Sequence, residues 1–306
     1  MTSAEPANAG LFPRYRDRIP DWEQFADACS RPAPVTIRTN TLRAETDELM
    51  HRLESVGVRV ETIDWSRSLV RVDRPVGRTL EHWLGHFYIQ EVNQTLPVVA
   101  LDPQPDETVL DLCAAPGGKT TQISARMENR GILIANEPSG RRQQALLANV
   151  NRLGTLNATI TEYRGESFPM TALFDRILVD APCSAEGTVR RETALRGGAT
   201  PATIRRLSRL QKRLLARAYA LLRPGGVLVY STCTFAPEEN EAVVADLLAS
   251  SDAKLAPAGL PVDTEPGWTE WEGVQWPPAL SRCARIYPHH LDSGGGFLAR
   301  IARPTT

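Results

Sequence analysis

Two of the five cysteines stand just past runs of residues that are typical of β-strands. Cys183 lies in "LVDAPCSAEGT" (178–188) and Cys233 in "YSTCTFAPEENE" (230–241). In an open parallel sheet, side chains just beyond the carboxyl ends of the strands face the ligand cleft and not the core. A thiol in a cleft can ionise and react, whereas a buried structural thiol is inert. The two motifs therefore predict a pair of reactive thiols at one edge of a sheet.

Asp180 precedes Cys183 by three residues at the same strand end, and these groups together suit chemistry on a pyrimidine ring. A thiolate that adds to carbon 6 of cytosine turns carbon 5 into a nucleophile toward the methyl group of a sulfonium. A carboxyl group that is hydrogen-bonded to ring nitrogen 3 and the exocyclic amine would stabilise the charge shift. A base must then remove the proton from carbon 5 so that the thiol can leave, and a second thiol, or a water it positions, could assist. Spacing alone does not say which cysteine attacks.

An attacking thiol needs a positive charge nearby, because a free cysteine titrates at about pH 8.5. Lys119 and a basic stretch between Ser184 and Arg223 are the candidates. That stretch holds ten basic and two acidic residues, and a predicted helix within it carries a positive stripe that suits nucleic acid. The alternative is a solvated helix face that acidic neighbours balance in space. The stripe consists of Arg205, Arg206, Arg209, Lys212, Arg213 and Arg217.

The strand "TVLDLC" runs straight into the glycine turn "AAPGGKT". Gly117 and Gly118 let the backbone pass close to a ligand, and the next helix turns its free amide groups toward it. The turn has neither the G-x-G-x-x-G pattern nor P-loop spacing, which disfavours dinucleotides and nucleoside triphosphates. Glu137, at the end of the second strand in "IANEPS", could accept hydrogen bonds from both hydroxyls of a ribose. This combination predicts S-adenosyl-L-methionine as the cofactor, although the turn alone would also serve as a plain strand-to-helix connection.

Strands alternate with helices from residue 108 onward, which indicates an α/β fold whose parallel sheet has both faces covered. Residues 1–100 have a different pattern, typical of a small α+β segment with strands in "PVTIRTN", "VRVETIDW", "LVRVD" and "FYIQ" and a helix in "AETDELMHRLESVG". A long helix is predicted from about Pro201 to Leu222. The closing "GGGFLARIAR" is predicted to form an edge or antiparallel strand.

The composition is that of an ordinary globular protein, with 306 residues and a formal net charge of −1. The five cysteines are an odd number with no C-x-x-C pair, so we expect neither a disulfide framework nor a metal site. No apolar stretch is long enough to span a bilayer, and residues 1–18 lack the pattern of a secretory signal. We therefore expect a cytoplasmic protein, and a monomer.

These motifs, in this order, resemble the RsmB/NOP family of RNA cytosine-5 methyltransferases. The resemblance covers nearly everything from Pro34 onward and includes "PVTIRTNTL", "FYIQEVNQTLP", "VLDLCAAPGGKT", "ANEPSGRR", "FDRILVDAPCSAEGTVRR", "LLRPGGVLVYSTCT", "PEENE" and "GGGFLARI". It implies a Rossmann-like class I methyltransferase fold, with a mostly parallel seven-stranded sheet whose last strand is antiparallel. Residues 101–306 would form this catalytic domain, and residues 1–100 the RNA-recognition segment.

The resemblance also implies a role for each site residue. Cys233 would be the nucleophile, and Cys183 would help to release the product, with Asp180 and Lys119 completing the catalytic set. The predicted partner is rRNA or tRNA, presented as a single-stranded or distorted segment. The predicted contacts are Cys113, Ala114, Ala115, Pro116, Gly117, Gly118, Lys119, Glu137 and Asp180 for the cofactor, and Arg190, Arg191, Arg205 and Arg209 for RNA.

Two departures from the family pattern stand out. In "CSAEG" the usual small residue is replaced, which would alter the base pocket slightly. An acid expected near the end of the third strand, where adenine is held, is missing from "TEYRGESFP". Arg164 stands about where that acid is expected, and Glu162 or Glu166 would be its substitutes.

Two other functions remain open at the level of sequence. One is a catalytically silent RNA-binding or ribosome-assembly factor, against which the complete set of Cys183, Cys233, Asp180 and Lys119 argues. The other is a DNA cytosine-5 methyltransferase, in which the cysteine of the Pro-Cys motif would attack.

Overall fold

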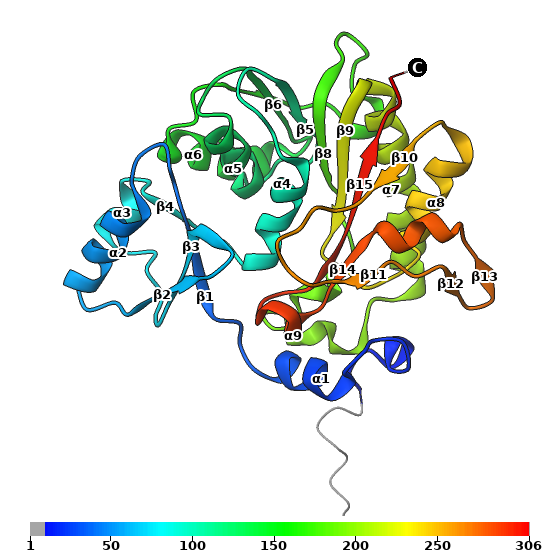
Figure 1. Cartoon of the computed structure of the whole chain (residues 1–306), viewed down its shortest axis with the longest axis horizontal. Coiled ribbons are helices and arrows are strands. Elements are labelled where there is room, and N and C mark those ends of the chain that lie inside the picture. Colours follow the sequence, from blue (N-terminus) through cyan, green and yellow to red (C-terminus); the bar gives the residue numbers. More distant parts are fainter. Residues whose placement is uncertain (1–9, 306) are drawn as a thin grey trace, which may run out of the picture.

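The computed structural model describes residues 10–305 and contains two main sheets (Figure 1). The smaller sheet is antiparallel with strand order β2-β3-β1-β4. Helix α2 (Thr46–Ser55) covers it, because Leu49 and Leu53 share one helix face and pack against Ile37 and Phe87. Its strands are β1 (Val35–Thr39), β2 (Val60–Ile63), β3 (Ser66–Val72) and β4 (Phe87–Ile89), with the short helix α3 (Leu80–Trp83) before β4.

The larger sheet is built around five parallel strands in the order β7-β6-β5-β8-β9. β5 lies in the middle, and the order reverses on either side of it, which places a ligand crevice beyond the carboxyl ends of β5 and β8. The predicted α/β architecture is confirmed. The strands are β5 (Thr108–Asp111), β6 (Ile132–Asn136), β7 (Ala158–Thr161), β8 (Phe174–Asp180) and β9 (Leu222–Thr232).

The last strand, β15 (Gly296–Ala302), pairs antiparallel with β9, as predicted. It is not an edge strand, because β14 (Ala284–Ile286) and β10 (Lys254–Ala256) pair end to end with its other side. β11 (Glu265–Pro266) pairs in turn with β14. These strands are two or three residues long and lie in a proline- and tryptophan-rich stretch, so no alternation in the sequence revealed them.

Helices cover both faces of the larger sheet, and the alternation of side chains along the strands explains why. Val109 and Leu178 point to one face, where α4 and α5 pack, while Leu110 and Ile177 point to the face of α7 and α8. Helix α6 packs beside α5. The bounds are α4 (Leu96–Leu101), α5 (Gly118–Arg126), α6 (Gly140–Leu153), α7 (Pro201–Leu221) and α8 (Glu241–Ser250).

The N-terminal elements pack against the larger sheet and not against the smaller one (Figure 1). Phe12, next to the 3-10 turn Pro13–Tyr15, and Phe25 in α1 (Trp22–Ser30) both contact the ring of Phe235, which lies just past the end of β9. The smaller sheet itself begins at Val35. The expectation about a secretory signal falls partly on residues 1–9, which lie outside the described residues. Within 10–305, no helix combines the length and the apolar character that crossing a membrane requires.

Candidate active site

The pairing of β8 with β9 brings the two predicted thiols together. Asp180, the last residue of β8, is paired in register with Ser231 of β9. Cys183 and Cys233 follow these positions, and their sulfur atoms lie 3.2 Å apart. The backbone N–H of Cys233 also donates to Cys183 Sγ at 3.3 Å. Both cysteines are unbridged and partly exposed, as a reactive thiol must be.

Two glycine segments allow the cysteine turns and the start of β15 to pack closely together. Gly187 donates its backbone N–H to the carbonyl of Cys233, and a Cβ on Gly187 would lie 2.3 Å from the carbonyl oxygen of Gly295. A Cβ on Gly296 would lie 2.5 Å from the carbonyl oxygen of Thr232. Any larger residue would therefore push the start of β15 away from the cysteine turns. The closing "GGG" of the sequence is a packing requirement of the site.

The electrostatic environment changes the pKa of the Cys183 thiol. The pKa of the Cys183 thiol is raised well above its usual value by its hydrogen bond with Cys233, by burial, and by the negative charges of Cys233 and Glu239. Two thiols in contact do not both ionise readily, because each thiolate repels the other. The raised pKa favours the protonated form of Cys183, and the S–H of one thiol can donate to the sulfur of the other.

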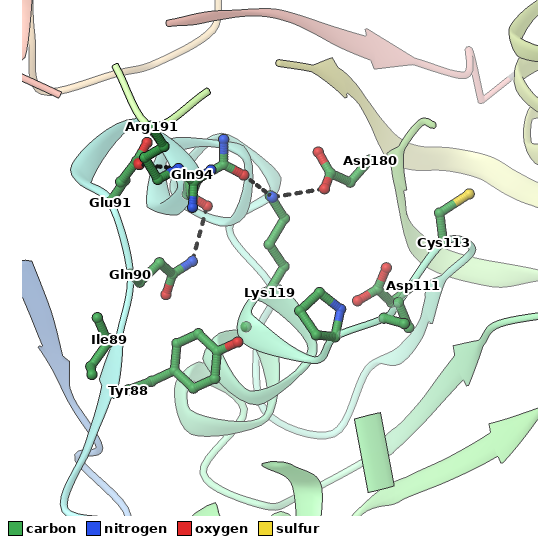
Figure 2. Close-up of a pocket in the computed structure, with 14 residues that line it drawn as sticks. Tyr88, Ile89, Gln90, Glu91, Gln94, Asp111, Cys113, Lys119, Asp180 and Arg191 are labelled. Carbon is green, nitrogen blue, oxygen red and sulfur yellow. Dashed lines mark hydrogen bonds and ion pairs between the residues drawn. The ribbon is translucent and has the colours of Figure 1, made fainter. Parts of the chain in front are cut away.

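Asp180 is held by two neighbouring groups, Lys119 and Ser231. Lys119 donates from Nζ to Asp180 Oδ2 at 2.7 Å and to Gln94 Oε1 at 2.6 Å, as Figure 2 shows. Ser231 donates its hydroxyl to Asp180 Oδ1 at 2.8 Å. The carboxylate is 31% exposed and the Lys119 side chain 10% exposed, so this ion pair is open on one side. Nothing in the sequence indicated that Gln94 and Ser231 contact this ion pair, since the two residues belong to motifs that are far apart in the chain.

A cavity of about 220 Å³ opens on this ion pair. The glycine turn forms one of its walls, and Tyr88 of the smaller sheet forms another (Figure 2). A Cβ on Gly118 would lie 2.9 Å from the Tyr88 ring, so the glycine is needed for the two domains to meet here. Cys183 and Cys233 are not among the lining residues, but lie beyond Asp180. The lining consists of Tyr88, Ile89, Gln90, Glu91, Gln94, Asp111, Cys113, Ala114, Ala115, Pro116, Gly118, Lys119, Asp180 and Arg191.

Asp111 is a lining residue that the sequence analysis treated only as part of a strand. It is 1% exposed, and Thr120 donates to its Oδ2 at 2.7 Å, while Oδ1 has no partner. Burial raises the pKa of the Asp111 carboxyl to about 7. A buried acceptor without a donor is costly unless a ligand supplies one. The free carboxylate oxygen of Asp111 can therefore accept a hydrogen bond from a cationic amine, a group that S-adenosyl-L-methionine has.

Cys113 and Glu137 occupy the predicted neighbourhood in different ways. Cys113 lines the cavity, and burial, with the charges of Asp111 and Asp180, raises the pKa of its thiol well above the usual value. Glu137 is 2% exposed and lies behind the glycine turn. Its carboxylate accepts from the backbone N–H of Ser139 at 2.9 Å and pairs with Arg142 at 3.1 Å. Its contact with a ribose stays a prediction.

One predicted RNA contact needs correction. Arg190 is buried, and its guanidinium donates to the carbonyls of Arg31, Pro32 and Ser293 and pairs with Asp292. A guanidinium with these partners has no face left for a phosphate, so Arg190 ties the N-terminal segment to the last turn before β15. The sequence placed it in a basic run without showing its burial.

The other predicted RNA contacts lie on the surface. Arg191 lines the cavity and pairs with Glu91 at 2.8 Å. Arg205 and Arg209 are exposed on α7 and form no ion pair with any of residues 10–305. Lys212 pairs with Asp246, so acidic neighbours balance the positive stripe only in part.

The two departures from the family pattern have structural descriptions. Ala185 does not line the cavity; instead, it has a left-handed backbone with a φ of 60°. This backbone conformation belongs to the turn after Cys183, and an effect on the base pocket stays a prediction. Glu166 is tied to Arg164 at 2.8 Å, and Glu162 is exposed, and neither lines the cavity. Whether either acid contacts adenine stays a prediction.

Comparisons with known proteins agree with this geometry. Residues 98–302 match the family model described as 16S rRNA methyltransferase RsmB/F, and residues 11–78 match an RsmF/B-like ferredoxin-like domain. The chain belongs to the RsmB/F methyltransferase family. The family predicted from the motifs is thus confirmed.

Relatives of this methyltransferase come from all three domains of life. The chain is 39% identical to a tRNA (cytosine(49)-C(5))-methyltransferase of Pyrococcus abyssi, over 97% of this chain and 96% of that protein. It is 38% identical to a human 28S rRNA (cytosine(4447)-C(5))-methyltransferase, but spans only 36% of that protein's length. A ribosomal RNA small subunit methyltransferase F from Pectobacterium carotovorum is 37% identical, with 99% of this chain and 64% of that protein covered.

Solved structures show the same fold. A methyltransferase homologue from Pyrococcus horikoshii superposes with a TM-score of 0.83 at 33% identity, covering 96% of this chain and 92% of that one. NSun6 from the same organism, solved with SFG, gives a TM-score of 0.85 at 22% identity. Both contain the class I methyltransferase fold predicted from the sequence.

Proposed function

We propose that this methyltransferase transfers a methyl group from S-adenosyl-L-methionine to carbon 5 of a cytidine in rRNA or tRNA, through a covalent bond between Cys233 and the base. The names of the relatives support the reaction and the RNA substrate. The observation that carries the covalent route is the 3.2 Å contact between two unbridged, partly exposed thiols next to Asp180. If the two cysteines served only as small apolar residues of the core, both sulfur atoms would be expected to be buried.

Cys233 would act first in the reaction. Its thiolate forms a bond to carbon 6, and the electron pair of the C5–C6 double bond shifts toward ring nitrogen 3, where Asp180 stabilises the change. Ser231 and Lys119 fix the direction of the Asp180 carboxylate. We assign the proton to Cys183, because the pKa of this thiol is raised, and its S–H can then donate to the attacking sulfur of Cys233.

Cys183 would act a second time during release. By then carbon 5 has formed a bond to the methyl group, and the cofactor sulfur has kept the electron pair of the broken S–CH3 bond. A water held at Cys183 takes the proton from carbon 5, the C5–C6 double bond re-forms, and the bond between Cys233 and carbon 6 breaks with its electron pair on sulfur. The Cys183 S–H then stabilises the departing thiolate by the same hydrogen bond.

The cofactor would lie in the cavity beside Lys119. S-adenosyl-L-methionine, when bound, supplies an electrophilic methyl group on its sulfonium. Asp111 offers an unpartnered carboxylate oxygen to the amino group, and the backbone from Cys113 to Lys119 lets the ligand approach closely. Glu137 remains the proposed ribose acceptor, through a rearrangement of its pair with Arg142.

Covalent trapping tests this assignment of the cysteines. We expect Cys233→Ala to form no adduct with RNA and no 5-methylcytidine, because the attacking atom is gone. Cys183→Ala should form a protein–RNA adduct that survives denaturing electrophoresis, because release fails while attack continues. The double variant Cys183→Ala/Cys233→Ala is the matched control and should form none.

Three other outcomes would overturn the proposal. An adduct that depends on Cys183, with activity on duplex DNA, would indicate the DNA enzyme. Cofactor binding without turnover on any class of RNA would indicate a silent RNA-binding factor. A Cys183→Ala variant that forms no adduct, while wild type methylates RNA, would show that the two thiols have other roles.

A further inference from the structure

Two consecutive residues before α8, Glu239 and Asn240, are completely buried between the two cysteine turns. Neither lines the cavity. The hydroxyl of Tyr230 donates to the backbone carbonyl of Glu239 at 2.6 Å, which anchors the dipeptide to β9. Their side chains point to different turns. Asn240 forms hydrogen bonds on both sides of Cys233, whereas Glu239 bonds on one side of Cys183 and reaches the other side through Gln211.

Glu239 serves the turn of Cys183. Its Oε2 accepts from the backbone N–H of Ser184 at 3.1 Å and from the side-chain amide of Gln211 at 2.7 Å. The same Gln211 amide donates to the carbonyl of Pro182 at 2.9 Å. The residues before and after Cys183 are thereby fixed by one Glu239–Gln211 pair, which is fully buried.

Asn240 serves the turn of Cys233 in the same way. Its Oδ1 accepts from the hydroxyl of Thr232 at 2.6 Å, and its Nδ2 donates to the carbonyl of Thr234 at 3.0 Å. The residues before and after Cys233 are thus fixed by one amide. The two turns also contact each other directly, through the hydroxyls of Ser184 and Thr234 at 2.7 Å and through the backbone N–H of Cys233, which donates to Cys183 Sγ.

We propose that Glu239 and Asn240 are positioning residues that hold the two thiols separately, Glu239 acting on Cys183 and Asn240 acting on Cys233. Since the dipeptide is rigidly anchored, it also fixes the distance between the two sulfur atoms. The inference rests on the proposed function for its kinetic consequence, in which loss of Glu239 impairs release and loss of Asn240 impairs attack. Its geometric consequence is independent of any reaction.

The geometric test measures how readily the two thiols join. Diamide oxidises two thiols to a disulfide, each sulfur losing its hydrogen to the diamide N=N bond, and peptide mapping by mass spectrometry identifies the pair. In the wild type, Cys183 and Cys233 should pair rapidly. In Glu239→Ala and in Asn240→Ala the rate should fall about tenfold or more, because disulfide formation requires specific geometry. Neither RNA nor cofactor is needed.

The kinetic test separates the two residues. With labelled RNA and cofactor, Glu239→Ala should accumulate adduct relative to product, as in Cys183→Ala. Asn240→Ala should lose adduct and product together, with turnover lower by about 100-fold, the loss that misplacing a reacting group by about 1 Å can cause. Glu239→Gln keeps an oxygen for Ser184 and should recover most of the wild-type ratio.

Controls address folding and location. Glu238→Ala removes the neighbouring carboxylate, which pairs with Arg14 and contacts neither cysteine turn, and it should match the wild type in both assays. Thr232→Val removes only the hydroxyl that donates a hydrogen bond to Asn240 Oδ1. It is a milder change that can replace Asn240→Ala if Asn240→Ala does not fold.

Either of two results would overturn the inference. One is wild-type disulfide formation in folded Glu239→Ala and Asn240→Ala variants. The other is an equal loss of adduct and product in both variants, which is what a general structural role would cause. A failure of the proposed function would be visible separately, as wild-type methylation in Cys233→Ala, and would leave the disulfide result standing.

Discussion

Two of the close carboxylate–cation pairs in the molecule have very different surroundings. In the cavity, Asp180 meets Lys119 at 2.7 Å, and both side chains keep some exposure. In the core, Glu241 meets Arg285 at 2.6 Å with 0% and 1% exposure. Arg285 also donates to the carbonyl of Phe235 and lies 3.7 Å from the Trp268 ring centroid, while Trp268 donates its backbone N–H to Glu241.

The difference lies in what each pair leaves unsatisfied. The core pair has protein partners around it and can bind nothing else, so its role is to join α8 to the strands of the sheet edge. The cavity pair is open toward a space lined by the glycine turn. Charge pairs of nearly equal length are thus enclosed by protein in one place and open to a cavity in the other. Exposure, and not distance, tells them apart.

Breaking the core pair should have the largest effect, and it should be on folding. Glu241→Gln leaves the Arg285 charge buried without its counter-ion, which costs about 3–5 kcal/mol of unfolding free energy. Urea denaturation followed by tryptophan fluorescence measures this, since Trp268 contacts both partners. The activity per folded molecule should change little. A loss below about 1 kcal/mol would mean that the core pair is no more structural than a surface pair.

Breaking the cavity pair should instead affect turnover. Asp180→Asn keeps the size of the side chain but removes the charge that stabilises the reacting ring, and we expect about a 100- to 1,000-fold loss of kcat. Unfolding free energy should fall by no more than about 1 kcal/mol, because a partly exposed pair contributes little. Single-turnover kinetics and urea denaturation on the same preparation give both numbers. If Asp180→Asn lost as much unfolding free energy as Glu241→Gln, the two charge pairs would not differ in their contribution to stability.

The pH dependence of cofactor binding should sharpen the contrast. The pKa of Asp111 is raised to about 7 from 3.8, so the carboxyl is neutral below about pH 7 and must lose its proton to meet a cationic amine. Affinity for S-adenosyl-L-methionine should therefore rise as pH increases through about 7, by up to about tenfold per pH unit. Isothermal titration calorimetry measures it, and Asp111→Asn should flatten the profile. A steep profile in that variant would assign the proton to another group.

The same shift makes a prediction about folding without cofactor. Because the folded carboxyl holds its proton up to about pH 7 and the unfolded one loses it at about pH 3.8, the Asp111 contribution to stability is greatest below the lower value. It declines as the pH rises through this window, and Asp111→Asn should remove the decline.

The smallest effect is expected at the turn after Cys183. Ala185 holds a left-handed backbone, with a φ of 60°, that glycine adopts without steric cost. Ala185→Gly should therefore stabilise the protein by about 1 kcal/mol. Ala216→Gly, at an exposed position in the interior of α7, is the control and should lose about 1 kcal/mol. Equal losses in both variants would show that the turn carries no strain.

The sequence by itself determined the order of strands and helices, the glycine turn and the position of both cysteines past strand ends. These features follow from local rules, namely periodicity, turn residues and the alternation of strand with helix. They were enough to predict the confirmed α/β fold, whereas the confirmed family was predicted from the resemblance of the motifs to a known family. They also placed Asp180 and Lys119 in the site, where the structure finds them 2.7 Å apart.

Tertiary structure alone decided which polar groups are buried and what they contact. Arg190 and Arg191 are adjacent in one basic run, yet one is enclosed by carbonyls and the other lies at the cavity. Asp111 looked like an ordinary strand residue, and Glu239 and Asn240 looked like a helix start. Burial and hydrogen-bond partners depend on segments up to hundreds of residues away, which no local pattern encodes.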